Sequence, residues 1–144
     1  MRATAKIVGS AHVARTFAQM EKSARGEVLE TALTAGALLV ANRWKENAPY
    51  KTGQYRRSIH VGGHTDQTPD FEGDDLGGNV HSATRAEVVI GTAITDPPYP
   101  RWLEDGTSRM SARPSAQPAF DETKAAALKE VHRALKILVT KAAK

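Results

Sequence analysis

Hydrophobic residues recur at helical spacing through the first third of the chain. From Val13 to Leu39 they fall three or four positions apart, and most charged residues lie between them. This spacing places the apolar side chains on one face of a helix, and Ser10 is suited to cap its N-terminus. Gly26 is less favourable than alanine in a helix interior by about 1 kcal/mol. The sequence therefore predicts a long helix that is kinked or broken at Gly26.

The second half of this helix is apolar on almost its whole circumference. Between Leu33 and Trp44 nearly every position is aliphatic, alanine, glycine or aromatic. Because a sheet covers only one side of a helix, we expect a second helix or a neighbouring subunit to cover another. The helix should end at Ala48, since Pro49 disfavours helical dihedral angles in the residue before it.

Three extended segments are predicted after the helix. Gly53 supplies a residue that tolerates positive φ in a tight turn. Apolar and polar residues then alternate from Tyr55 to Val61, which is typical of a strand. Ala86 to Thr92, with a β-branched centre, predicts a second strand, and a turn at 97–100 leads into an extended piece at Arg101 to Thr107.

The remaining segments complete an α+β fold. Thr4 to Gly9 reads as a short strand or extended arm, 62–84 as a long acidic loop or a loosely ordered hairpin, and 108–117 as an exposed connector. Pro118 fits the first turn of a closing helix. We expect one domain over 1–144, with a long kinked N-terminal helix and a C-terminal helix packed on a small antiparallel sheet. The apolar stripe predicted for the closing helix is Phe120, Ala127, Leu128, Val131, Leu135 and Leu138.

The amino-acid composition limits the classes of protein to which this chain can belong. With 144 residues, 40% hydrophobic and only 6% aromatic, the chain is long enough for one modest core. The absence of cysteine excludes disulfides, thiolate catalysis and cysteine-based metal sites. The first twenty residues lack the apolar run of a signal peptide, and we expect no membrane-spanning segment. These observations predict a soluble protein without a membrane partner.

Charge is distributed unevenly along the chain. Residues 1–62 and 109–144 are net basic, whereas 63–108 contain nine Asp and Glu against two Lys and Arg. A dedicated DNA-binding protein usually has a continuous basic face, so this pattern matches one poorly. It fits charge-complementary contacts between copies or partners, although solvated surface charge is the alternative.

Catalytic and metal-binding patterns are weak. His60, His64 and Asp66 contain ligand types, but the glycines between the histidines leave their geometry unspecified, so we favour a solvated loop. The acidic run 70–75 does not follow the order of a calcium-binding loop. Nucleophile elbows, phosphate loops and dinucleotide fingerprints do not occur. The sequence predicts no enzyme, cofactor or metal.

One nucleic-acid hypothesis remains open at the junction between helix and strand around Gly53. We call this junction, residues 48–59, the corner. Lys51, Arg56 and Arg57 are able to pair with phosphates, and Tyr50 and Tyr55 to stack on bases. The alternative, which we favour, is that the basic residues cover a strand face and the tyrosines pack under the corner.

Three segments resemble the gene-product-ten-like neck proteins of lambdoid, long-tailed bacteriophages, the head-tail connector and tail-completion proteins. Segment 48–59 resembles the family's Ala-Pro helix end, Thr-Gly turn and Arg-Ser-Ile strand. Segment 99–107 resembles its element of Tyr followed by aliphatic-Glu-x-Gly-Thr, with Trp102-Leu103 as a departure at the aliphatic step. Segment 117–120 resembles its Pro-led entry to the final helix. The long acidic loop 62–84 is a second departure.

The resemblance implies a virion structural protein, assembled in the host cytoplasm, with no catalytic residues. It implies a ring, expected to be a hexamer, in the neck or tail. The ring would lie between a portal-side adaptor or head-closure protein and the tail terminator or tail tube, around DNA that passes without sequence-specific binding. Our own hypothesis is that the acidic stretch from Asp66 to Asp75 projects into the channel or onto an adjacent ring. The motif and interface candidates are Pro49, Thr52, Gly53, Tyr55, Arg56, Arg57, Ser58, Tyr99, Trp102, Glu104, Gly106, Thr107 and Pro118.

Overall fold

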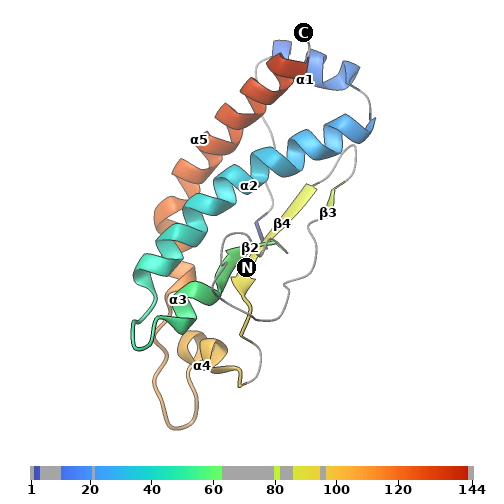
Figure 1. The fold of residues 1–144 in the computed structure, drawn as a ribbon. Coiled ribbons are helices and arrows are strands. Elements are labelled where there is room, and N and C mark those ends of the chain that lie inside the picture. Colours follow the sequence, from blue (N-terminus) through green and yellow to red (C-terminus); the bar gives the residue numbers. More distant parts are fainter. Residues whose placement is uncertain are drawn as a thin grey trace.

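A computed structural model describes residues 2–3, 11–20, 22–62, 80–81, 86–94 and 97–142 (Figure 1). The predicted α+β class is confirmed. None of the described helices combines the length and hydropathy needed to cross a membrane. The predicted strand at Thr4 to Gly9 and most of the loop 62–84 lie outside the described residues. The elements are, in order, β1 (Arg2–Ala3), α1 (Ala11–Gln19), α2 (Lys22–Asn47), α3 (Gln54–Ser58), β2 (Ile59–Val61), β3 (Val80–His81), β4 (Ala86–Thr92), α4 (Tyr99–Asp105) and α5 (Ala116–Ala142).

Strand β4 is the centre of the sheet, and its predicted bounds are confirmed. β1, β2 and β3 each pair with it in antiparallel register. The side chains of Ala86, Val88 and Ile90 are buried, and the residues between them are less so. This alternation is what a strand with one face on the core requires.

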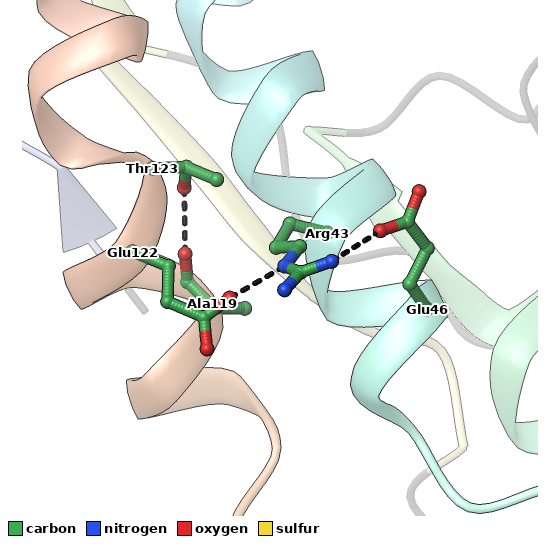
Figure 2. A network of polar contacts seen from close by, with 5 residues as sticks. All are labelled: Arg43, Glu46, Ala119, Glu122 and Thr123. Atoms are coloured by element: carbon green, nitrogen blue, oxygen red, sulfur yellow. Dashed lines mark hydrogen bonds and ion pairs between the residues drawn. The ribbon is translucent and has the colours of Figure 1, made fainter.

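Helix α2 lies between the sheet and α5 (Figure 1), which explains its apolar circumference. Its contacts with β2 and β4 cover one side, and the long helix α5 packs along another. Within the described residues a second helix therefore supplies the additional cover. Figure 2 shows one polar contact at this helix pair, where Arg43 Nε donates to Glu122 Oε2 at 2.5 Å and Arg43 also contacts Glu46 on its own helix.

The two long helices approach each other closely at Gly36. A Cβ atom at this position would overlap Val131 Cγ2 and lie 2.8 Å from the carbonyl oxygen of Ala127. Small buried residues on both helices, including Ala32 and Ala119, are consistent with close packing of the pair. Glycine at position 36 is therefore a requirement of the helix crossing.

The predicted break at Gly26 is wrong. α1 ends at Gln19 and α2 begins at Lys22, so Gly26 lies inside α2, where it is buried. Beside the break, Arg25 Nε donates a hydrogen bond of 2.9 Å to the carbonyl oxygen of Met20. Tertiary packing and this side-chain contact outweigh the weak helix propensity of glycine.

The strand predicted at Tyr55 to Val61 is partly wrong. Residues 54–58 form the one-turn helix α3, and the strand begins only at Ile59. Gly53 has the predicted positive φ, 76°, and its carbonyl oxygen accepts the N–H of Arg57 at 3.0 Å. The left-handed turn thus leads directly into a helical turn. The predicted helix end at Ala48 is confirmed to within one residue, since α2 ends at Asn47.

The extended piece predicted at Arg101 to Thr107 is also wrong. These residues lie largely in α4, which Tyr99 and Pro100 begin, and proline is well tolerated in a first helical turn. Gly106, with φ of 76°, ends the helix by donating to the carbonyl oxygen of Trp102 at 2.9 Å. Glu104 and its neighbour therefore lie on a helix.

The C-terminal region follows the prediction with two differences. Pro118 lies in the first turn of α5, as expected, but Ser115 is buried, so the exposed connector ends at 114. Leu128 of the predicted stripe is 54% exposed, and Val139 is buried. The buried positions of α5 are Ala119, Ala127, Val131, Leu135 and Val139.

Candidate functional site

A buried polar network joins four separate segments near one end of the molecule. Trp44 Nε1 donates to Ser115 Oγ at 3.0 Å and to the Tyr55 hydroxyl at 3.2 Å. The Tyr55 hydroxyl donates to Glu104 Oε1 at 2.9 Å. Trp44, Tyr55 and Ser115 are each at most 4% exposed. We call these four residues the Tyr55–Glu104 network.

Glu104 also caps the N-terminus of α5. Its carboxylate accepts the backbone N–H groups of Ser115 and Ala116 at 2.9 to 3.2 Å, and the Ser115 hydroxyl at 2.5 Å. N–H groups at the start of a helix have no intrahelical partner, and the helix dipole favours negative charge there. A residue of α4 thus fixes where α5 begins.

Burial raises the pKa of Tyr55 from 10.0 to about 12. The charge and hydrogen bond of the Glu104 carboxylate contribute to this raised pKa, and the hydrogen bonds with Ser115 and Trp44 act against it. The network therefore holds Tyr55 as a neutral phenol that donates to Glu104.

Replacing Tyr55 with phenylalanine should change how stability depends on alkaline pH. The neutral phenol contributes stability fully below pH 10, and this contribution is lost as pH rises toward 12, because the unfolded chain ionises first. Between pH 9 and pH 11 the free energy of unfolding of the original protein should fall by about 1 kcal/mol more than that of Tyr55→Phe. Urea denaturation of both proteins at both pH values measures this difference in the free energy of unfolding. Equal pH dependence of the two proteins would contradict the raised pKa.

The corner residues are engaged mainly in local structure. Arg56 Nε donates to the carbonyl oxygen of Ala48 at 2.9 Å, and its guanidinium lies 5.2 Å from the centre of the Tyr50 ring. The Ser58 hydroxyl bonds to the carbonyl oxygen of Tyr55 and to the Thr92 hydroxyl. Arg56 and Ser58 therefore stabilise the backbone of the corner.

The other corner candidates lie at the surface or support the turn. Thr52 Oγ1 accepts the N–H of Gln54 at 3.4 Å. Pro49 and Arg57 are exposed. Tyr55, by contrast, packs its ring edge-to-face against Tyr99, with 6.1 Å between ring centres. Tyr99 thereby links the corner to the start of α4.

A short hydrogen-bonded loop follows α4. The backbone groups of Thr107 and Met110 bond to each other in both directions, and the N–H of Arg113 donates to the carbonyl oxygen of Leu103 at 2.7 Å. A Cβ atom at Gly106 would lie 2.8 Å from the nitrogen of Ala112, so glycine is needed there in addition to its positive φ.

Exposed cations gather around the corner, α4 and this loop, which lie at one end of the molecule in Figure 1. Arg101 forms an exposed ion pair with Asp105 at 3.4 Å. The other cations have no acidic partner among the residues that the structure describes. Apolar side chains are exposed among them, with Tyr50 69%, Trp102 43% and Met110 37% accessible. We call this surface the basic end; it consists of Tyr50, Lys51, Arg57, Arg101, Trp102, Arg109, Met110 and Arg113.

The histidine candidate for a metal site belongs to the core. His60 is 3% exposed in β2, and its Nδ1 donates to the carbonyl oxygen of Ser58 at 2.9 Å, so the solvated loop predicted for it is wrong. His64 and Asp66 lie outside the described residues. Within the described ranges no group of three metal-ligating side chains comes together.

Two members of the network were not identified as polar partners from the sequence. The sequence indicates Trp44 only as part of an apolar helix face, although a buried indole N–H needs an acceptor. Ser115 lies three residues before Pro118, a position where serine commonly caps a helix, and it was interpreted as part of an exposed connector. Both signals are visible in the sequence, but neither identifies the partner.

Comparison with known proteins matches most of this chain to a bacteriophage protein family. A family model described as "Bacteriophage HK97-gp10, putative tail-component" matches residues 11–106, two thirds of the chain. The chain belongs to this HK97-gp10-like family of phage tail components, which confirms the resemblance found in the sequence. Comparisons with curated proteins and with solved structures find no significant match.

Proposed function

We propose that this phage tail component acts by assembly, forming a ring in the neck that joins head to tail around the DNA channel. The observation that carries the proposal is the family match over 11–106, which contains both the corner and α4. The Tyr55–Glu104 network links these two segments through buried hydrogen bonds. They therefore present one continuous, internally supported end of the molecule to a partner.

The network also divides the interface candidates into two groups. Tyr55, Ser58 and Glu104 act through the shape that they give to this end, because their polar groups are engaged inside the protein. Exposed candidates remain available for contacts with other chains, and these are Pro49, Thr52, Arg57, Trp102 and Thr107.

Ring formation follows from a contact between unlike surfaces of identical copies. Such a heterologous contact closes into a ring when its rotation is a whole fraction of a turn. We propose a hexamer, with a portal-side adaptor or head-closure protein on one side and a tail terminator or tail tube protein on the other. DNA would pass through it without sequence-specific contacts.

The nucleic-acid alternative receives less support. Of its three residues, Arg56 is engaged with Ala48 and with the Tyr50 ring, so only Lys51 and Arg57 are free within the described part of the chain. A DNA-binding module would show an affinity that falls steeply with salt concentration, because each phosphate contact releases counterions.

Light scattering of the purified protein over a range of concentrations tests the proposal, followed by imaging of any ring. A discrete closed oligomer is expected, alone or on addition of the adjoining neck proteins. Phage that lack this protein should accumulate heads and tails that do not join. A protein that stays monomeric in both conditions, together with normal joining in the deletion phage, would contradict the proposal.

A further inference from the structure

The basic end differs in composition from the outer face of α5. Four of its five cations are arginine, whereas the outer face of α5 carries four lysines and one arginine. Arginine, tryptophan, tyrosine and methionine are enriched at protein interfaces, and lysine is depleted there. Tyr50, Trp102 and Met110 supply the other three types, and all three are exposed. The basic end therefore has the composition of a protein interface, and α5 that of a solvated face.

At the corner, an aromatic ring and a cation lie side by side. Tyr50 Cε2 lies 3.0 Å and Arg57 Nη1 2.9 Å from the position that a Cβ atom on Gly53 would occupy. The guanidinium of Arg56, itself bonded to a backbone carbonyl oxygen, lies 5.2 Å from the centre of the Tyr50 ring. Cation–π attraction therefore orients the exposed ring before any partner binds. One partner surface can contact the Tyr50 ring and the Arg57 guanidinium together.

Exposed apolar side chains also follow arginine on α4 and in the loop after it. Trp102 comes directly after Arg101 on α4, and Met110 comes directly after Arg109 in the loop. Arginine binds carboxylates through two parallel hydrogen bonds, and the neighbouring apolar surface gains free energy when it is removed from water. A matching partner therefore presents carboxylates beside apolar side chains.

The loop that carries these side chains is already held in place. Its Thr107–Met110 hydrogen bonds, the left-handed Gly106 and the bond from the N–H of Arg113 to Leu103 fix its backbone. The Tyr55–Glu104 network joins α4 to the corner beneath the same surface. A preorganised surface loses little conformational entropy on binding. The basic end is thus arranged for contact in the isolated protein.

The described surface of a second copy matches this chemistry poorly. Five of its carboxylates already form ion pairs within their own chain, and these are Glu46, Asp105, Asp121, Glu122 and Glu130. They would have to give up these pairs in order to bind the basic end. A duplex DNA backbone would pair with the cations but bury little of Trp102 and Met110. The observations therefore favour a different protein as the partner.

We propose that the basic end docks onto a carboxylate-bearing surface of another virion protein, with Tyr50 and Trp102 as apolar anchors. The arginines of α3 and of the loop pair with the carboxylates of that surface, and the two rings pack between them. This inference rests on the proposed role in assembly, and it names the surface that is used and the chemistry of its partner.

Binding to unjoined virus particles tests the docking surface. Phage that lack this protein supply isolated, nuclease-treated heads and tails, and sedimentation measures how tightly the purified protein binds each. The original protein should bind one of the two. Arg109→Glu with Arg113→Glu should weaken this binding about tenfold or more, because like charges then face each other. Trp102→Ala should weaken it to a similar degree, because an aromatic anchor is lost.

Matched control variants lie on α5, outside the basic end. Lys129→Glu with Lys136→Glu reverses the same amount of exposed charge, and Leu128→Ala removes an apolar side chain that is 54% exposed. Neither should change the binding to particles. Circular dichroism confirms that each variant is folded. Light scattering should give the same oligomer mass for the original protein and for the variant with both arginines reversed.

Three results would overturn the inference. The first is that the basic-end variants bind particles as tightly as the original protein, or that a ring-forming original protein binds neither kind, and in both cases the proposed ring stands. The second is a loss of self-association on reversal of the two arginines, which assigns the surface to contacts between copies. The third is binding of a short DNA duplex that is lost on the same reversal, which assigns the surface to DNA.

Phage that carry the two arginine reversals test the chemistry of the partner. Derivatives that regain growth should replace aspartate or glutamate by lysine or a neutral residue in another virion protein, because the new carboxylates at 109 and 113 then meet no negative charge. Compensating changes confined to acidic residues of this chain would overturn the inference.

Discussion

Replacing Glu104 with alanine is expected to lower the free energy of unfolding by about 2–4 kcal/mol, the sum of a lost helix cap and unsatisfied buried donors. The carboxylate accepts the first N–H groups of α5, the Ser115 hydroxyl and the Tyr55 hydroxyl. Without it the buried Tyr55 hydroxyl loses its acceptor in α4. Denaturant unfolding followed by circular dichroism measures the loss.

Asp105→Ala is the matched control for this experiment. Asp105 is the next residue on the same helix, but it is exposed and only pairs with Arg101. Its removal should change stability by no more than about 0.5 kcal/mol. A Glu104→Ala protein as stable as Asp105→Ala would show that the network contributes little and that α5 starts without it.

Gly36→Ala should also destabilise the protein, by about 1–3 kcal/mol, although alanine is the better helix former by about 1 kcal/mol. The added methyl group would overlap Val131 Cγ2 and approach the carbonyl oxygen of Ala127, so α2 and α5 would have to separate. Backbone atoms of a neighbouring helix yield less readily than a flexible side chain. Thermal unfolding of the variant shows directly whether the substitution raises or lowers the stability of the protein.

Two further variants separate the effect of the helix crossing on stability from the effect of intrinsic helix propensity. Ala125→Gly changes an exposed position inside α5 and should cost about 1 kcal/mol through propensity alone. Combining Gly36→Ala with Val131→Ala should cost less than the sum of the single changes, because one methyl group then occupies space that the other vacates. A Gly36→Ala protein with a raised melting temperature would contradict the close crossing.

Strong local signals allowed part of the fold to be predicted from the sequence. Pro49 ends α2, Gly53 adopts positive φ, and the β-branched centre of β4 marks the strand with its correct bounds. Each of these depends on the residue itself and its immediate neighbours. The apolar circumference of α2 likewise indicated cover on more than one side.

Short elements were predicted poorly because a run of only a few residues fits both the helical period and the strand period. Residues 55–58 alternate as a strand would, yet one turn of helix satisfies the backbone after the left-handed Gly53. The prolines before α4 were interpreted as a turn, although Pro100 begins the helix. In both cases hydrogen bonds to adjacent segments, which a local pattern does not contain, decide the structure.

The Tyr55–Glu104 network could not be predicted from local pattern, since its partners are 49 residues apart. Both residues were selected only because they lie in the segments that resemble the phage family. The structure brings those segments into contact. The corner supplies Tyr55, α4 supplies Glu104, and the carboxylate starts the helix that contains Pro118.

The position of α2 between the sheet and α5 has a consequence for how the chain folds during synthesis. Contacts of α2 with α5 span wide sequence separations, such as the 79 residues between Arg43 and Glu122. Until the ribosome has released 116–142, one apolar side of α2 has no cover within the described part of the chain. Such long-range contacts slow folding and leave apolar surface open to aggregation. The nascent chain should therefore remain open to aggregation along this side of α2 until α5 emerges.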